Sequence, residues 1–261
     1  MLSMNTKFLV LQFRPEDDAS DGEFEAMLRF GRIRPEEAER VRMEQGAVPS
    51  LDVKKYTGIL AGGGPFNISD SEEKKGAVGK MVEEHLFPIV EEIISSDIPF
   101  LGACYGLGAL VKALGGTVSK NGFAEAAGAT DIVITSAGKS DALLVGLESP
   151  FRAFTGHKEA CESVPEGAVL LATSPQCPVQ MIRVKQHVYA TQFHPELDPQ
   201  GIRVRIDAYR HHGYFASEEA ESLKEACLRE HIIVPLEILR RFVERARKVS
   251  EKTLSCYGVL G

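Results

Sequence analysis

Two short motifs in this sequence hold residues that can do covalent chemistry. Cys104 stands in a Gly-Ala-Cys-Tyr-Gly segment that directly follows an apolar run. His194 and Glu196 belong to a Gln-Phe-His-Pro-Glu segment that also follows an apolar run. A cysteine among small residues on a strand-to-helix turn is the thiol form of a nucleophile elbow. A thiol nucleophile needs a base, and the base needs an orienting group. The sequence therefore predicts a triad of Cys104, His194 and Glu196.

A second histidine competes for the role of base. His157 also lies two residues before a glutamate, Glu159. Position 194 is preferred because it closes an apolar run and is fixed by Pro195, whereas His157 follows less regular sequence. We therefore expect His157 near the site, with His194 as the base. Taken alone, Cys104 would fit a buried structural cysteine equally well, and the second motif favours catalysis.

A glycine turn could supply the electrophilic part of such a site. Gly62, Gly63 and Gly64 precede Pro65 and end another apolar run. After a strand, such a turn can direct a backbone N–H at a developing oxyanion. The N–H of Tyr105, directly after the nucleophile, would be the second donor. The glycines taken alone also fit a simple tight turn.

Hydrophobic patterning predicts the elements that must position these motifs. The charged segment 14–46 is expected to hold two helix-like pieces, the second beginning at Pro35. Strands are expected at 7–13, 56–61, 98–101, 131–135, 168–172, 179–184 and 188–192, and helices at 81–95 and from the elbow to Gly115. Alternating strands and helices favour an α/β fold with a mostly parallel central sheet flanked by helices.

The pattern changes towards the C-terminus. Segments 217–231 and 234–249 read as two charged amphipathic helices. We expect a core domain over 1–215 and a C-terminal helical extension over 216–261 that packs on it. A contact between copies in a homo-oligomer is the alternative use of the apolar faces of these helices.

Composition narrows the classes of partner. The chain has 261 residues, of which 44% are hydrophobic and 26% charged, with a net charge of −7. This is typical of a globular protein, and without a basic stripe neither nucleic acid nor a membrane surface is an expected partner. The N-terminus does not resemble a signal peptide, and the five scattered cysteines suit free thiols. We therefore expect a cytoplasmic location.

No cofactor is expected. The spacing of histidines, cysteines and carboxylates matches no metal motif. The segment Gly138-Lys139-Ser140 lacks the first glycine of a phosphate loop, because Val133 occupies that position.

Together, the glycine turn, the GACYG elbow and the QFHPE motif resemble class I glutamine amidotransferases, over residues 7–198. The likeness is greatest to stand-alone bacterial proteins similar to the amidotransferase part of GMP synthetase. The resemblance implies Cys104 as nucleophile, His194 and Glu196 as its partners, and oxyanion donors at Gly64 and Tyr105. It also implies attack on a glutamine amide, release of ammonia, and hydrolysis of a γ-glutamyl thioester.

The sequence departs from the family pattern in the expected substrate pocket. Many members carry glutamine four residues after the cysteine, and here that position is Gly108. The segment around Phe123, which lines the amino-acid end of the pocket in the family, is also unusual. Loss of an amide side chain removes hydrogen bonds that discriminate substrates. The hydrolytic chemistry is thus better supported than free glutamine as the substrate.

Three functions fit these observations. The first is an amidotransferase that acts on a small-molecule substrate and supplies ammonia to a separate synthetase subunit, because this sequence has no SGGxDS-like loop for ATP. The second is a γ-glutamyl peptidase or hydrolase that needs no partner, for which Gly108 would leave room. The third is a catalytically silent regulatory or scaffold protein. Whether residues 65–76 form a lid is left open.

Overall fold

The computed structural model describes residues 7–46, 48 and 51–258. Its main sheet has nine strands in the order β2-β1-β3-β4-β11-β10-β9-β6-β7. Strands β2, β1, β3, β4 and β11 pair in parallel, and β10, β9, β6 and β7 continue the sheet with antiparallel pairing. The expected α/β class is confirmed, with a mixed sheet whose parallel half carries the elbow.

The parallel strands are short, and all but the edge strand β2 are mainly apolar. They are β1 (Phe8–Gln12), β2 (Ala38–Arg42), β3 (Gly58–Ala61), β4 (Phe100–Ala103) and β11 (Val188–Thr191). All residues of β1, β3, β4 and β11 are buried, as expected for strands that are covered on both faces. The antiparallel strands are β6 (Glu125–Ile134), β7 (Phe151–His157), β9 (Ala168–Thr173) and β10 (Met181–Val184), and β5 (Val118–Ser119) pairs separately with β8 (Ala160–Cys161).

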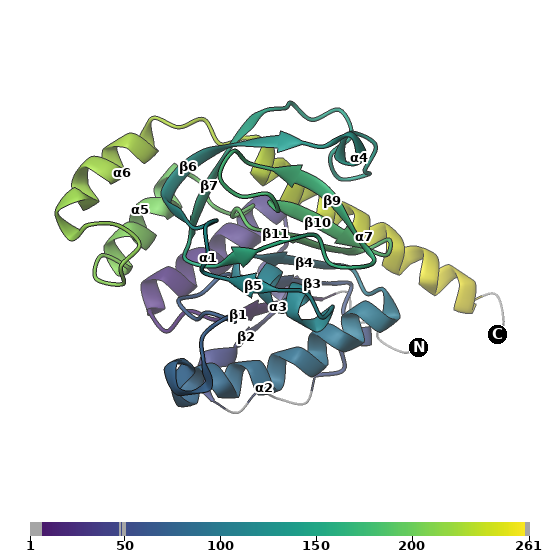
Figure 1. Ribbon diagram of the computed structural model, residues 1–261. Coiled ribbons are helices and arrows are strands. Elements are labelled where there is room, and N and C mark those ends of the chain that lie inside the picture. Colours follow the sequence, from purple (N-terminus) through teal and green to yellow (C-terminus); the bar gives the residue numbers. More distant parts are fainter. Residues whose placement is uncertain (1–6, 47, 49–50, 259–261) are drawn as a thin grey trace.

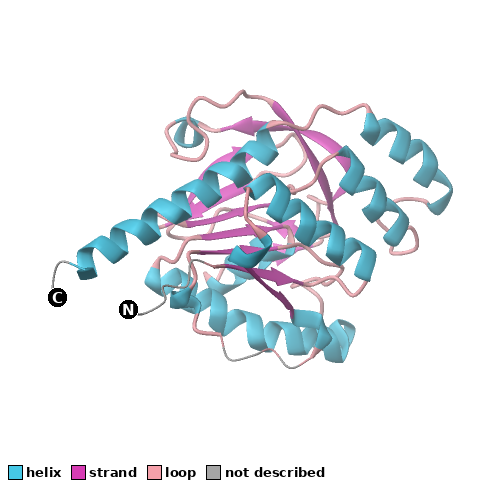
Figure 2. Cartoon of the chain, turned by 180° about the vertical axis from the view of Figure 1, so that it is seen from behind, coloured by secondary structure: helices cyan, strands magenta, loops and turns pink. Residues whose placement is uncertain are grey.

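Helices cover both faces of the sheet. On one face lie α2 (Glu72–Ser96) and α3 (Tyr105–Ala113), which share a core with Leu9, Ile59 and Phe100 (Figure 1). On the other lie α1 (Asp17–Gly31) and α7 (Val234–Gly258), whose cluster includes Phe8 and Leu60. Figure 2, the view from behind, shows the long helix that leads to the C-terminus crossing this second face.

The remaining helices stand beside the antiparallel half of the sheet. They are α5 (Pro199–Ala208) and α6 (Ala220–Leu228), with the short α4 (Ser136–Lys139) at the far end. A third apolar cluster joins Ile202 and Ile206 of α5 to Cys227 of α6 and to Phe154 of β7. The C-terminal helices therefore bury apolar side chains against the rest of this chain. No helix in the described ranges is long and apolar enough to cross a membrane.

One predicted helix is wrong. Pro35 begins only a 3₁₀ turn (Pro35–Glu37), and β2 follows where a helix was expected. Val41 is the one fully buried residue of β2, because this strand lies at the edge of the sheet. Arg40 and Arg42 of the strand bind Gln12 and Glu44. The charged residues of this edge strand therefore resemble the polar face of a helix in the sequence.

Two further elements differ from expectation. Helix α2 begins at Glu72, well before the predicted start at 81, with non-helical backbone at Gly76 (φ 65°) inside it. The predicted strand at 131–135 is only the end of β6, which pairs along β7. These long antiparallel strands were missed because half-exposed glycine and alanine fill the first part of β6, where an apolar alternation would otherwise mark a strand.

Candidate active site

Cys104 is the turn between β4 and α3. Its backbone has φ 53° and ψ −97°, a conformation that is costly for any residue except glycine. The Cys104 N–H donates to the Thr191 carbonyl at 2.8 Å, which ties the turn to the end of β11. Strain of this kind persists only where the surrounding structure enforces it, and it clusters at functional sites.

Two glycines make this turn feasible. A Cβ on Gly102 would stand 2.8 Å from Cε1 of Phe100, and one on Gly106 would stand 3.2 Å from the Ala61 carbonyl oxygen. A side chain at either position would therefore force the strand and the helix apart. The small residues of the motif are required by close packing around the thiol.

His194 and Glu196 follow the adjacent strand, β11. The His194 N–H donates to the Phe154 carbonyl at 3.0 Å, and Nδ1 lies 3.0 Å from Oε1 of Glu196. A Cβ on Gly63 would lie 2.8 Å from Cε1 of His194 and 3.3 Å from Cβ of Cys104, so the imidazole and the thiol flank this glycine. Within the described ranges Nε2 of His194 has no hydrogen-bond partner. This arrangement leaves Nε2 free to exchange a proton with the thiol.

A buried cluster of two arginines and two glutamates lies next to His194 and includes Glu196. Arg205 donates from Nη2 to Oε1 of Glu196 at 2.6 Å and to Oε2 of Glu23 at 3.2 Å. Arg14 donates from Nε to the same Glu23 oxygen at 2.7 Å. All four side chains are almost fully buried, and their formal charges cancel. Burial of charge is tolerable only with such pairing.

Arg205 also competes for the orienting position of the histidine. Its Nη1 lies 2.9 Å from Nδ1 of His194, which is the atom that faces Glu196. A neutral imidazole carries one N–H, so Nδ1 either donates to Glu196 or accepts from Arg205. Only the first tautomer leaves a lone pair on Nε2 for the thiol proton. The position of Arg205 therefore bears directly on how often His194 is a competent base.

Burial influences the protonation states of Cys104, His194 and Glu196. It raises the pKa of the Cys104 thiol from 9.0 to about 12, despite the attraction of the Arg14 charge. It also lowers the pKa of His194, and the Arg205 charge adds to this effect. Burial alone would raise the pKa of Glu196, but His194 and Arg205 hold it well below its usual range. At neutral pH the resting site is thus a neutral thiol beside a neutral imidazole and an ionised carboxylate.

The expected oxyanion donors stand beside the thiol. Tyr105 is the first residue of α3, and N–H groups in the first turn of a helix have no partner within it. Gly64 lines the space around Cys104, and a Cβ there would come within 2.5 Å of the Phe13 carbonyl oxygen. Backbone this close leaves room only for glycine at position 64.

Two cavities meet at Cys104. The first, called here the Arg14 cavity, has about 470 Å³ of empty space, part of it open to solvent. The second, the Glu159 cavity, has about 360 Å³. Gly64 and Tyr214 line both of them, so the thiol stands at their junction. A substrate with its reacting carbonyl at Cys104 could therefore extend to either side.

The space above Gly108 is already occupied. Gly108 lines the Glu159 cavity, but a Cβ there would meet Cγ1 of Ile68 at 3.1 Å and Oε1 of Glu159 at 3.6 Å. The Glu159 carboxylate accepts from the N–H groups of Ile68 (2.8 Å) and Ser69 (2.9 Å). The loop around Ile68 is thus fastened over the position where the missing glutamine side chain would lie. Phe123 is half-buried and lines neither cavity.

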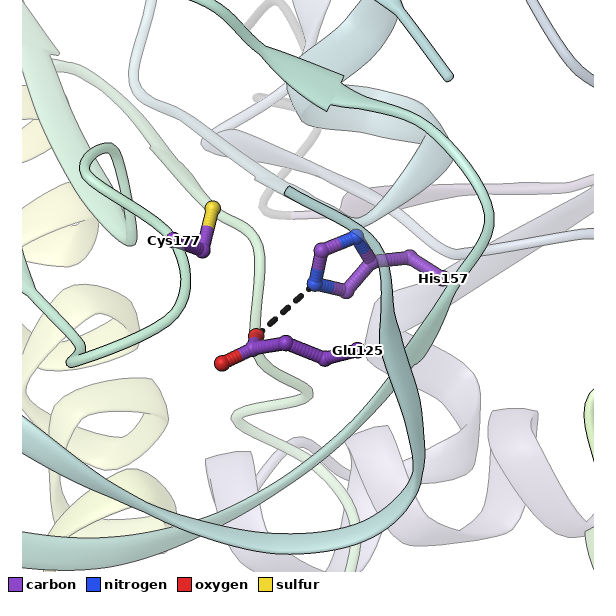
Figure 3. Close-up of side chains that lie close together, drawn as sticks. All are labelled: Glu125, His157 and Cys177. Carbon is purple, nitrogen blue, oxygen red and sulfur yellow. Dashed lines mark hydrogen bonds and ion pairs between the residues drawn. The ribbon is translucent and has the colours of Figure 1, made fainter. Parts of the chain in front are cut away.

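His157 borders the Glu159 cavity but belongs to a separate buried cluster. Figure 3 shows it pointing at Glu125, with Cys177 nearby. Nε2 of His157 lies 2.8 Å from Oε2 of Glu125, and Nδ1 lies 2.9 Å from the Glu159 carbonyl oxygen. Both ring nitrogens therefore face acceptors, which leaves neither free to accept a proton from the thiol.

The same cluster is the one place among the described residues where three ligand atoms suitable for a metal converge. They come from Glu125, His157 and Cys177 and lie within 4.8 Å of one another. Each already has a protein partner, because Ser174 and Gln180 donate to Glu125 and the Cys177 thiol faces the Val179 carbonyl. Burial alone would raise the pKa of Glu125, but His157 and these donors lower it. The hydrogen bonding accounts for the cluster without an ion.

Sequence reasoning did not identify three charged residues at the site, namely Arg14, Glu23 and Arg205. Arg14 could have been found, since it follows β1 at the carboxyl edge of the parallel strands, where ligands bind in open α/β sheets. Glu23 and Arg205 lie inside α1 and α5, where charged residues normally mark a solvated face. Only the packing of α1 against α5 brings these two side chains together.

The chain is similar in sequence to known proteins. The model of the family "Glutamine amidotransferase class-I" matches residues 18–206. The GMP synthase [glutamine-hydrolyzing] of Lactobacillus delbrueckii subsp. bulgaricus is 34% identical over 153 residues, which are 58% of this chain and 26% of that protein. The chain thus spans about a quarter of the length of the curated relatives it matches.

Solved structures share the fold. A glutamine amidotransferase from Thermotoga maritima has a TM-score of 0.74 and 23% identity over 94% of this chain and 99% of that one. A glutamine amido transferase from Methylobacillus flagellatus has a TM-score of 0.70 and 19% identity over 94% of this chain and 95% of that one.

Proposed function

Because this chain belongs to the class I glutamine amidotransferase family, we propose that it hydrolyses the side-chain amide of glutamine, or a γ-glutamyl amide, through a thioester on Cys104. The observation that carries the proposal is the strained Cys104 turn beside His194, whose Nε2 is unpaired among the described residues and whose Nδ1 faces Glu196. These are the geometric roles of nucleophile, base and orienting group.

The first half of the reaction forms the thioester. Nε2 of His194 takes the thiol proton as the Cys104 sulfur attacks the γ-carbonyl carbon. The N–H groups of Gly64 and Tyr105 would stabilise the oxyanion of the tetrahedral intermediate. The intermediate collapses as the C–N bond breaks, and His194 returns its proton to the leaving nitrogen. Because the resting pair is neutral, this proton moves only as attack occurs.

The second half releases glutamate. A water molecule gives a proton to His194 as it attacks the thioester carbonyl, and the C–S bond breaks to restore the thiol. Ammonia from the first half would be used by a separate synthetase subunit.

Ammonia and glutamate release by the purified chain tests this function. Glutamine and a γ-glutamyl dipeptide are the two substrates, and Cys104→Ala is the control. Turnover that disappears in the variant supports the proposal. Turnover that persists in Cys104→Ala would contradict it. Failure of a glutamine-like electrophile to modify Cys104 would favour a silent scaffold.

A γ-glutamyl hydrolase that acts without a partner is the second candidate. The observation that favours it is the Arg14 cavity, on the side of Cys104 away from Glu159. Preference for a γ-glutamyl dipeptide over glutamine in the same assay would select this candidate.

A further inference from the structure

The Arg14 cavity adjoins Cys104 and opens to solvent on part of its boundary. If the glutamyl group occupies the Glu159 cavity, the leaving group departs into the Arg14 cavity. Glutamine leaves only ammonia there. Because the cavity is open on one side, a leaving group larger than ammonia can extend out of it.

Apolar side chains form most of this wall. The segment after β11 and the helix α5 contribute Leu197, Ile202 and Ile206, all buried. The segment that connects α5 to α6 contributes the rings of Tyr214 and Phe215. Cavities lined in this way bind apolar groups, with a few polar groups that fix orientation.

Arg14 is the polar group in the wall that lies beside the thiol. Its side chain is 4% exposed and donates from Nε to Glu23 and from Nη1 to the Tyr209 hydroxyl at 3.0 Å. Nη2 has no hydrogen bond to any residue in the described part of the chain. A Cβ on Gly63 would stand 2.9 Å from Nη2 and 3.3 Å from Cβ of Cys104. An unpaired guanidinium donor in an apolar wall favours an anionic acceptor, above all a carboxylate.

The Glu159 cavity has the opposite character. Its lining includes the polar residues Asn67, Lys158, Glu159 and Gln192. Polar groups of both signs suit the amino and carboxylate groups of a glutamyl moiety. The glutamyl group therefore fits this side of Cys104 and the leaving group fits the other.

We propose that the Arg14 cavity binds the leaving amino acid of a γ-glutamyl dipeptide whose second residue has a large apolar side chain. This inference rests on the proposed function. In such a dipeptide the α-carboxylate is two bonds from the scissile nitrogen, so it lies close to the nucleophile, where Nη2 of Arg14 stands. The apolar side chain extends towards Ile206 and Phe215.

The chemistry requires no added reagent. The Cys104 sulfur forms a bond to the γ-carbonyl carbon, the C–N bond breaks, and His194 protonates the departing α-amino nitrogen. Water then hydrolyses the thioester. The products are glutamate and the free apolar amino acid.

Four substrates separate the contributions of the carboxylate and of the side chain. They are γ-Glu-Phe, γ-glutamyl phenethylamide (which lacks the carboxylate), γ-Glu-Gly (which lacks the side chain) and glutamine. We expect kcat/KM for γ-Glu-Phe to exceed that for each of the others at least tenfold. Arg14→Gln should remove most of the advantage over the phenethylamide. The matched control Arg203→Gln, on the exposed side of α5, should keep it.

The outcomes distinguish this inference from the proposed function. If kcat/KM for glutamine equals kcat/KM for γ-Glu-Phe, the inference is overturned and the proposed function stands. An equal loss on all four substrates in Arg14→Gln would overturn the carboxylate role, because Arg14 would then act on the thiol. If Arg14→Gln does not fold, the unmodified chain tests the carboxylate role by itself. In that case kcat/KM for γ-Glu-Phe must exceed kcat/KM for γ-glutamyl phenethylamide at least tenfold, and equal values would overturn the inference.

A binding measurement tests the cavity without turnover. Calorimetry on Cys104→Ser should show L-phenylalanine binding at least tenfold more tightly than phenethylamine. Equal affinities, or no binding of L-phenylalanine, would overturn the inference. If no substrate is hydrolysed by the unmodified chain, the proposed function fails, and this measurement still decides what the cavity binds.

Discussion

The molecule has two buried histidine–glutamate pairs, and they differ in what the second ring nitrogen meets. His194 lies 3.0 Å from Glu196, and its Nε2 has no partner among the described residues. His157 lies 2.8 Å from Glu125, and its other nitrogen faces the Glu159 carbonyl. Both histidines are buried, at 6% and 4% exposure. Of the two, only His194 keeps a ring nitrogen without a partner among the described residues, and this difference is the basis for proposing it as the base.

The surroundings of the two glutamates extend the contrast. Both carboxylate oxygens of Glu125 are paired, because Ser174 donates to Oε1 and Gln180 donates to Oε2. Glu196 pairs with Arg205 through Oε1, and its Oε2 is buried without a partner among the described residues. The paired carboxylate of Glu125 braces β6 against β7 and the turn before β10. The unpaired oxygen of Glu196 leaves hydrogen-bonding capacity close to the thiol.

Replacing each histidine should separate activity from stability. We expect His194→Asn to lower kcat/KM by about 10³-fold or more, because loss of a triad member removes proton transfer and its coupled steps. The same change at His157 should lower activity far less, provided that the protein is folded. Steady-state kinetics on both variants measures this. Equal losses of activity in two folded variants would contradict the assignment of the base.

Glu125→Gln should reverse the contrast and act mainly on stability. The change removes charge-assisted hydrogen bonds to a buried carboxylate, each worth about 1.5–3 kcal/mol, so the free energy of unfolding should fall by about this amount, measured by urea denaturation at pH 7. The pKa of Glu125 is lower in the folded state than the usual 4.5. The contribution of its charge is therefore complete above pH 4.5 and is lost as pH falls through the folded-state value. An unchanged urea midpoint at pH 7 would refute the bracing role.

Arg205→Met should also destabilise the fold, because Glu23 and Glu196 lose a buried partner. In the folded variant we expect the smallest effect on activity, a shift of the pH profile. In the unmodified chain the acid limb of kcat/KM is expected below pH 6.5, because burial and the Arg205 charge lower the pKa of His194. Loss of the positive charge should raise the pKa of His194 and move this limb to higher pH by about half a unit or more. A shift of one pKa unit corresponds to about 1.4 kcal/mol of interaction free energy. Arg205→Lys, which keeps the charge, is the control. An identical limb in all three proteins would refute the electrostatic role.

The sequence predicts the parts of the candidate site that follow strands. Cys104 and the His194 segment each end an apolar run, and small or turn-forming residues mark the point where the chain bends. The residues that complete the site are carried by helices. Glu23 and Arg205 face each other only because α1 and α5 pack side by side, and no local pattern encodes that contact. Long-range packing therefore set the limit of sequence reasoning.

The failure at β2 has a related cause. Arg40 binds Gln12 of β1 and Ser20 of α1, and Arg42 binds Asp17 of α1, so the strand depends on contacts that are distant in sequence. The same holds for His157, whose sequence neighbourhood resembles that of His194. Only the position of Glu125 on the neighbouring strand shows that its ring is fully engaged.

Covalent modification by a glutamine analogue with a diazoketone in place of the amide tests the central claim most directly. Attack by an activated thiol on this analogue releases N₂ and leaves a stable thioether, which peptide mass spectrometry locates. We expect modification at Cys104 in the unmodified chain and in folded His157→Asn, and at least 100-fold slower modification in His194→Asn. Modification that is as fast in His194→Asn, or that occurs equally at Cys161, would contradict the claim that Cys104 and His194 form the catalytic pair.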